Sequence, residues 1–169
     1  MTIEASRRAL FARYRGGPAQ LRPPWSRRED DFIDACTRCA KCVEVCPTGL
    51  LTKGHAGYPI ADFIRGHCTF CRACADACEA ACFVARDAET APWPLTATIS
   101  TACIEPKGVS CRMCEDACDV AAILFRPARG GGAVATVSAD VCTGCGACVA
   151  RCPVKAISIS TPVPAEAHA

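Results

Sequence analysis

Four cysteine-rich segments dominate the sequence and restrict what the chain can fold into. The segment 36–47 reads CTRCAKCVEVCP, in which cysteines separated by two, two and three residues are followed by proline. The segment 142–153, CTGCGACVARCP, repeats the spacing and the proline. The segment 68–78, CTFCRACADAC, keeps the spacing, whereas 103–118 has seven residues between its first two cysteines, and an acidic residue follows both. Four such segments in one short chain are not a chance product of its composition.

The spacing is typical of cysteines that bind 4Fe-4S clusters in bacterial ferredoxins. Three cysteines two residues apart in a tight loop can reach three irons of one cluster, and the fourth lies about one helical turn further on. In two-cluster ferredoxins that fourth cysteine binds the other cluster. We therefore predict four 4Fe-4S clusters with crossed ligation. The predicted ligand sets are Cys36, Cys39, Cys42 and Cys78; Cys46, Cys68, Cys71 and Cys74; Cys118, Cys142, Cys145 and Cys148; and Cys103, Cys111, Cys114 and Cys152.

Zinc and disulfide bonds are the alternative uses for 17 cysteines. A structural zinc site needs four ligands, usually as two separated cysteine pairs, so a third cysteine at the same spacing in every segment would have no role. Disulfide pairing would leave one thiol over, because the number of cysteines is odd. Iron–sulfur clusters are therefore the favoured cofactor.

The basic start of the chain resembles an export signal but lacks its apolar core. Ser6, Arg7 and Arg8 look like a twin-arginine signal, yet the apolar run that follows ends at Ala12. A signal peptide needs an apolar run of about 7–15 residues. No stretch of the sequence is long and apolar enough for a membrane-spanning helix. We therefore predict a cytoplasmic protein without a transmembrane segment, in which thiols stay reduced.

The order of the segments predicts an α+β fold of two tandem two-cluster ferredoxin-like halves. The halves would occupy residues 31–87 and 98–161, joined by a linker at 88–97, with a basic arm at 1–30 and a tail at 162–169. Leu, Ile, Val and Phe together supply only 32 of the 169 residues, which predicts a small core. Small cores generally need covalent or metal staples, and here the clusters would fill that role.

Short strands and helices fit between the cysteine segments. Alternating apolar residues predict strands at 121–127, 133–139 and 156–160, and a weaker hairpin is predicted around 54–57. A short helix is expected after the third cysteine of each segment. Because clusters would occupy much of the interior, metal binding should supply folding energy, and the metal-free chain should be largely unfolded.

No recognisable catalytic set accompanies the cysteines. The sequence has no Gly-rich phosphate loop and no fingerprint for a nicotinamide or flavin cofactor. We therefore predict an electron-transfer or accessory protein and not an enzyme.

The seventeenth cysteine, Cys82, falls outside the pattern and follows Cys78 by four residues. One interpretation is an alternative cluster ligand. A buried free thiol is favoured, because cysteine packs as a small hydrophobic residue.

Several motifs together resemble the NapF family of ferredoxin-type proteins. They are the opening I-x-A-S-R-R at 3–8, LRPPWS at 21–26, the CTRC that starts the first cysteine segment, CRMCEDAC at 111–118 and ILFRP at 123–127. The resemblance implies a cytoplasmic iron–sulfur protein that interacts with the catalytic subunit of the periplasmic nitrate reductase before export of that subunit. It also implies a role in maturation, through electron transfer or cluster assembly. A general polyferredoxin that carries electrons in another oxidoreductase system is the alternative.

The basic arm is the predicted contact with that partner. Residues 1–30 hold seven arginines and three acidic residues. We expect the arm to dock on the partner through Arg7 and Arg8. Nucleic acid is not expected as a partner, because the arm has few aromatic residues to stack on bases and the whole chain carries a net charge of only +2.

Overall fold

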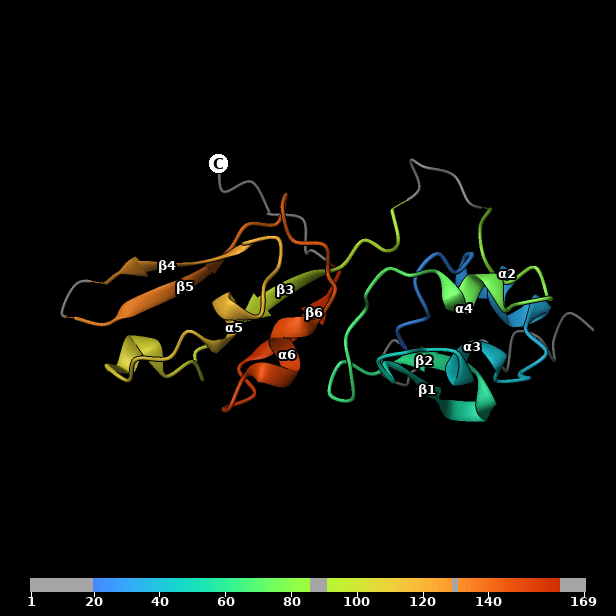
Figure 1. Cartoon of the computed structure of the whole chain (residues 1–169), viewed down its shortest axis with the longest axis horizontal. Helices are drawn as coiled ribbons and strands as arrows, with labels where there is room; N and C mark the ends of the chain where they lie inside the picture. Colours follow the sequence, from blue (N-terminus) through green and yellow to red (C-terminus); the bar gives the residue numbers. More distant parts are fainter. Residues whose placement is uncertain (1–19, 86–90, 129–130, 162–169) are drawn as a thin grey trace, which may run out of the picture.

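The computed structural model describes residues 20–85, 91–128 and 131–161, which form two lobes arranged side by side (Figure 1). The first lobe, blue to green in Figure 1, contains α2, α3, α4, β1 and β2. The second lobe, yellow to red, contains β3, α5, β4, β5, α6 and β6. The first-lobe elements are α2 (Glu29–Ala35), α3 (Lys41–Glu44), β1 (Leu51–Lys53), η1 (His55–Gly57), β2 (Pro59–Ala61) and α4 (Ala73–Asp76). The second-lobe elements are β3 (Thr96–Ile99), η2 (Glu105–Lys107), α5 (Met113–Asp116), β4 (Ile123–Pro127), β5 (Ala133–Val137), α6 (Ala147–Arg151) and β6 (Ile157–Ser160).

Three antiparallel strand pairs organise the described residues. The predicted strands of the second half are confirmed as β4, β5 and β6, and the predicted weak hairpin is confirmed as β1 and β2. The strand β3 was not predicted. It pairs with β6, so that Thr98 lies opposite Ser158, 60 residues away along the chain. A turn signal between neighbouring strands can predict a hairpin, but such a signal does not exist for two strands that far apart.

The apolar core is thin, as the composition predicts, and thiols form part of it. In the first lobe, Leu50, Leu51 and Phe63 pack around the buried Cys74. In the second lobe, Ile123 and Ile157 pack around the buried Cys148. Cysteine side chains therefore occupy interior positions that aliphatic side chains fill in most small domains.

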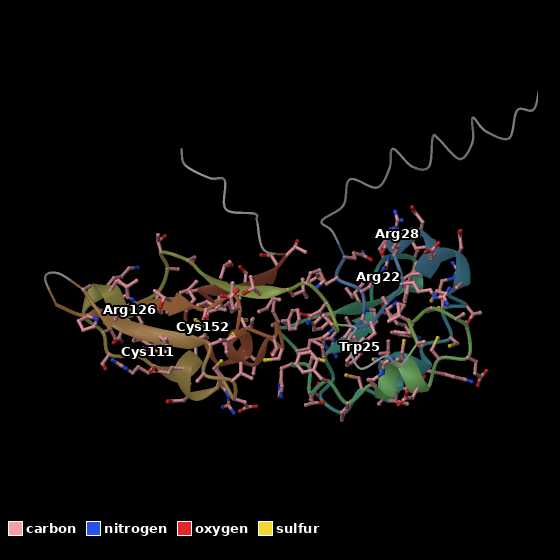
Figure 2. All side chains as sticks on the ribbon, turned by 90° about the horizontal axis from the view of Figure 1, so that it is seen from above. Arg22, Trp25, Arg28, Cys111, Arg126 and Cys152 are labelled. Carbon is pink, nitrogen blue, oxygen red and sulfur yellow. The ribbon has the colours of Figure 1, made fainter. Side chains whose placement is uncertain are left out.

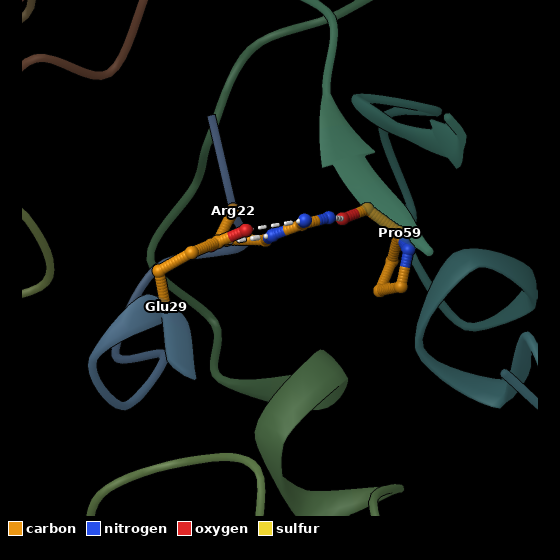
Figure 3. A network of polar contacts seen from close by, with 3 residues as sticks. All are labelled: Arg22, Glu29 and Pro59. Atoms are coloured by element: carbon orange, nitrogen blue, oxygen red, sulfur yellow. Dashed lines mark hydrogen bonds and ion pairs between the residues drawn. The ribbon is translucent and has the colours of Figure 1, made fainter. Parts of the chain in front are cut away.

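The segment before α2 lies against the first lobe. Arg22 donates two hydrogen bonds to the carboxylate of Glu29, at 2.7 and 2.8 Å, and a third to the carbonyl oxygen of Pro59 at the start of β2, at 3.2 Å (Figure 3). The backbone N–H of Ala61 donates to the carbonyl of Leu21 at 2.7 Å, and Trp25 is buried. Residues 20–28, which the sequence analysis places in the basic arm, are thus part of the folded first lobe.

The two lobes contact each other through an aromatic and backbone junction. Phe63 packs edge-on against Trp93, with ring centroids 5.6 Å apart, and Leu95 belongs to the core of the first lobe although it leads into β3. The backbone N–H of Cys68 in the first lobe donates to the carbonyl of Cys145 in the second at 2.8 Å. The lobes are therefore held by direct contacts as well as by the connecting chain.

Membrane-spanning elements were not expected, and the described part of the chain contains no helix long and apolar enough to cross a bilayer.

The junction predicts a specific sensitivity at Gly146. A Cβ atom placed there would lie 2.0 Å from the ring of Phe63, and the φ of Gly146 is +80°. Gly108 has nearly the same φ, +83°, but a Cβ there would meet nothing within 4 Å. We expect Gly146→Ala to destabilise the protein by about 1–3 kcal/mol more than Gly108→Ala, because only the first change overpacks the junction. Anaerobic denaturation of both variants measures the difference, and equal stability would show that Phe63 moves aside without cost.

Candidate metal centres

Three of the four cysteine segments form the same loop. In each, the residues on both sides of the second cysteine have positive φ, between +55° and +80°. The pairs are Arg38 and Ala40, Phe70 and Arg72, and Gly144 and Gly146. A left-handed conformation turns backbone N–H groups toward one side and forms the concave nests that bind anions and iron–sulfur clusters. Four of these six residues carry a side chain, and each such conformation costs about 1–2 kcal/mol. A bound anionic cluster would offset this local cost.

A short helix after each loop directs the third cysteine inward. The helices α3, α4, α5 and α6 begin one residue before that cysteine, so the predicted helices are present and start slightly earlier than expected. Burial raises the pKa of the third cysteine in every segment, to about 11 for Cys42 and Cys114 and to about 12 for Cys74 and Cys148. These thiols keep their protons at neutral pH unless a metal displaces them, so metal binding here would release protons.

The structure gathers the cysteines around four cavities, and each cavity is lined by four of the sixteen predicted ligands. Each cavity encloses about 310 to 340 Å³ of space between protein atoms, part of it open to solvent. In every cavity three cysteines come from one segment and the fourth from its neighbour, which is the crossed arrangement that the spacing predicts. Site 1 is lined by Cys36, Cys39, Cys42 and Cys78; site 2 by Cys46, Cys68, Cys71 and Cys74; site 3 by Cys118, Cys142, Cys145 and Cys148; and site 4 by Cys103, Cys111, Cys114 and Cys152.

Backbone N–H groups face the sulfur atoms in these cavities. The N–H of Phe70 donates to the Sγ of Cys68 at 3.3 Å. The N–H groups of Ala122 and Ala156 donate to the Sγ atoms of Cys118 and Cys152, each at 3.2 Å. Such donors stabilise thiolate sulfur, and hydrogen bonds to sulfur also tune the reduction potential of an iron–sulfur centre.

Site 4 reaches the same arrangement with a different loop (Figure 2). Cys111 and Cys152 come from different segments and lie in the second lobe, where both line site 4. The seven residues after Cys103 include η2, and its residue Glu105 is buried, with 5% of its surface exposed. The Glu105 carboxylate accepts a hydrogen bond from the N–H of Cys111. The longer loop is therefore held by a side chain, and the residues on both sides of Cys111 lack the positive φ found in the other three loops.

The donor set and the cavities fit 4Fe-4S clusters. Four cysteine thiols around a cavity, with backbone N–H groups aimed at sulfur, supply the ligands and hydrogen bonds that such a cluster takes. Within the described residues, no three His, Cys, Asp or Glu side chains converge tightly enough to hold a single metal ion. The thiols are thus spread around a space larger than one ion. The assignment of each cysteine as a ligand remains a prediction.

Two further predictions concern residues other than the sixteen predicted cysteine ligands. Cys82 is buried, as expected, with 2% of its surface exposed, and it also lines site 1. Arg7 and Arg8 lie outside the described residues. The role of Glu105 could not be predicted from the sequence, because a lone glutamate in a loop carries no signal. The two glycines of CTGCGAC, in contrast, indicate positive φ.

The comparisons with known proteins agree with this chemistry. A family model described as a 4Fe-4S dicluster domain matches residues 35–83, and a second one of the same description matches residues 107–156. The chain is 43% identical to ferredoxin-type protein NapF of Escherichia coli (strain K12) over 159 residues, 94% of this chain and 96% of that protein. It is 45% identical to ferredoxin-type protein NapF of Haemophilus influenzae, covering 83% of this chain and 78% of that one. It is also 33% identical to methylamine utilization ferredoxin-type protein MauM of Methylorubrum extorquens, covering 78% and 67%.

Paired cysteine variants would test the crossed ligation. Cys46 and Cys71 line the same cavity, whereas Cys46 and Cys39 belong to the same segment but to different cavities. With crossed ligation, Cys46→Ala with Cys71→Ala should damage one cluster, and Cys46→Ala with Cys39→Ala should damage two. Mössbauer spectra of the anaerobically purified variants count the intact 4Fe-4S clusters. The opposite pattern would mean that each segment binds its own cluster.

Glu105 should matter for stability as a hydrogen-bond acceptor. Glu105→Ala leaves the N–H of the half-buried Cys111 without this partner, and the loss should cost about 1 kcal/mol, the low end for an unsatisfied buried donor. Glu105→Gln keeps an acceptor oxygen at the same position and should be less harmful. Anaerobic thermal unfolding, followed through the visible absorbance, compares the two midpoints. Equal midpoints for both variants would exclude the acceptor role.

Proposed function

The chain belongs to the NapF family of ferredoxin-type proteins, and from this premise we propose that it passes electrons singly through four 4Fe-4S clusters to a protein partner. Each 4Fe-4S cluster supplies one-electron chemistry when bound. The chain's own residues hold the thiols and bring the sites close together. The partner in this proposal is the catalytic subunit of the periplasmic nitrate reductase, met in the cytoplasm before export and assisted in its maturation.

The continuous order of the four sites is the observation that carries the electron-transfer part of the proposal. Cys42 of site 1 and Cys46 of site 2 pack on the core that contains Cys74. Site 2 meets site 3 where the N–H of Cys68 donates to the carbonyl of Cys145. Site 3 adjoins site 4 through the apolar core of the second lobe. In that apolar core the site 3 residue Cys148 is buried, and the site 4 residues Cys114 and Cys152 pack against the core. An electron could enter at one end of this series and leave at the other.

The exposure of the cysteines indicates which sites exchange electrons with a partner in this proposal. Cys39 of site 1 and Cys71 of site 2 are exposed, whereas the cysteines of sites 3 and 4 are half-buried or buried. A cluster whose ligands reach the surface lies closer to a docked protein. The first lobe, which also follows the basic arm in sequence, is therefore the proposed docking side.

A general polyferredoxin is the second candidate function. The MauM relatives, whose printed name places them in methylamine utilization, share about 30% identity with this chain over two thirds or more of their own length. A similar sequence therefore occurs in proteins with a different named role. In this alternative the sites and their order are the same, and only the partner differs.

Partner capture separates the two candidates and tests the arm. The cluster-replete protein, used as anaerobic bait in cytosol, should capture the nitrate reductase catalytic subunit with its signal peptide still attached, as identified by mass spectrometry. Arg7→Gln with Arg8→Gln should weaken this capture. The matched control is Arg27→Gln with Arg28→Gln, an exposed adjacent pair whose replacement removes the same charge.

The control decides between position and charge. If both double variants lose capture equally, the arm acts through overall charge and Arg7 and Arg8 are not specific contacts. Capture of a different redox complex by the unmodified protein would support the polyferredoxin alternative and reject the nitrate reductase partner.

A further inference from the structure

Site 1 differs from the other three sites because five thiols line it. Cys82 lines the same cavity as Cys36, Cys39, Cys42 and Cys78. Sites 2, 3 and 4 are each lined by four cysteines. A 4Fe-4S cluster takes four cysteine ligands, so one thiol of site 1 exceeds the requirement.

The fifth thiol shares its cavity with the four predicted ligands. Only 2% of the surface of Cys82 is exposed, and Cys82 lines site 1 together with Cys36 and Cys78. The backbone holds it there: the N–H of Arg27 donates to the carbonyl of Cys82 at 2.9 Å, and Ser26 forms an antiparallel bridge with Phe83. The position of Cys82 is therefore set by the folded segment that precedes α2.

The fourth cysteine of site 1 differs from its two counterparts in the second lobe, which accept a backbone hydrogen bond. In the second lobe, Cys118 and Cys152 each accept a hydrogen bond from the N–H four residues further on, at Ala122 and Ala156. In site 2, the hydroxyl group of Thr48 lies 3.7 Å from the Sγ of Cys46.

The residue four positions after Cys78 is Cys82 itself. The N–H of Cys82 donates instead to the carbonyl of Ala80, and the Cys78 thiol also donates to that carbonyl, at 3.2 Å. Glu79, which takes the place of the proline found after Cys46 and Cys152, is exposed and pairs with Lys41 at 2.5 Å. Residues 78–82 thus bend so that a second thiol lines the cavity, where the two second-lobe segments bring a backbone donor.

We propose that Cys82 is an exchangeable ligand of the cluster in site 1, so that either Cys78 or Cys82 binds its fourth iron. This inference rests on the proposed clusters. In the exchange, the bond from iron to the Cys78 sulfur breaks, the bond from iron to the Cys82 sulfur forms, and the proton of the Cys82 thiol passes to the Cys78 thiolate. No electron is gained or lost, and the proton passes within the cavity that both thiols line.

Site 1 would then keep four irons when either thiol is lost. An exposed cluster is prone to oxidative damage, and oxidation of a ligating thiol normally frees its iron. Sites 1 and 2 each contain an exposed thiol, Cys39 and Cys71, and of these two sites site 1 has the fifth thiol.

Alanine variants of three cysteines test the proposal with an internal control. Cys78→Ala and Cys82→Ala should each keep about 16 irons per chain, four per cluster. Cys78→Ala combined with Cys82→Ala should lose the fourth iron of site 1 and show the EPR signal of a 3Fe-4S cluster in the oxidised protein. Cys46→Ala is the matched control, because site 2 contains no fifth thiol and should show that signal after a single change.

The outcomes are distinguishable. If Cys78→Ala alone gives the 3Fe-4S signal, loses site 1 or fails to fold, Cys82 cannot replace Cys78 and the proposal is wrong. If Cys82→Ala alone gives that signal, Cys82 is the sole fourth ligand and there is no exchange. An unmodified protein with clearly fewer than four clusters would overturn the proposed function, independently of the comparison between Cys78 and Cys82.

Discussion

Thiol groups around the four cavities are the constraint on which the rest of the structure depends. The elements that bring them together are short: no helix among the described residues exceeds seven residues and no strand exceeds five. Isolated helices and hairpins of this length are marginal in water. The buried third cysteines also have raised pKa values, so the metal-free fold would hold uncharged thiols around poorly filled spaces. Binding of iron would supply the folding free energy that such a thin apolar core lacks.

The sequence predicted the parts of this fold that local patterns encode. The cysteine spacing predicted four groups of thiols, and alternating apolar residues predicted β4, β5 and β6. It did not predict β3, because β3 pairs with a strand 60 residues away and that pairing leaves no local pattern. It also placed residues 20–28 in a basic arm, because a run of arginines indicates solvent exposure, whereas Arg22 is held by Glu29 and by the carbonyl of Pro59.

The contacts between the lobes could not be predicted from the sequence either, because they join residues that lie far apart along the chain. The motif CTGCGAC contains two glycines, and positive φ alone explains why glycine suits both positions. Only the structure shows that Gly144 faces the backbone of Leu95 and that Gly146 faces the ring of Phe63. The same two glycines therefore serve the loop around site 3 and the junction with the first lobe. This dual use links the geometry of one metal centre to the packing of the whole molecule.

The predicted crossed ligand sets would also impose an order on biosynthesis. As the chain leaves the ribosome from its N-terminus, site 2 has all its cysteines once residue 74 has emerged, whereas site 1 must wait for residue 78 although it contains the first cysteine of the chain. In the second lobe, site 3 is complete at residue 148 and site 4 only at residue 152. In both lobes the site next to the junction is thus complete before the outer one. In each lobe the nascent protein would acquire the iron–sulfur centre next to the junction first. The outer centre would then form beside a neighbour already in place.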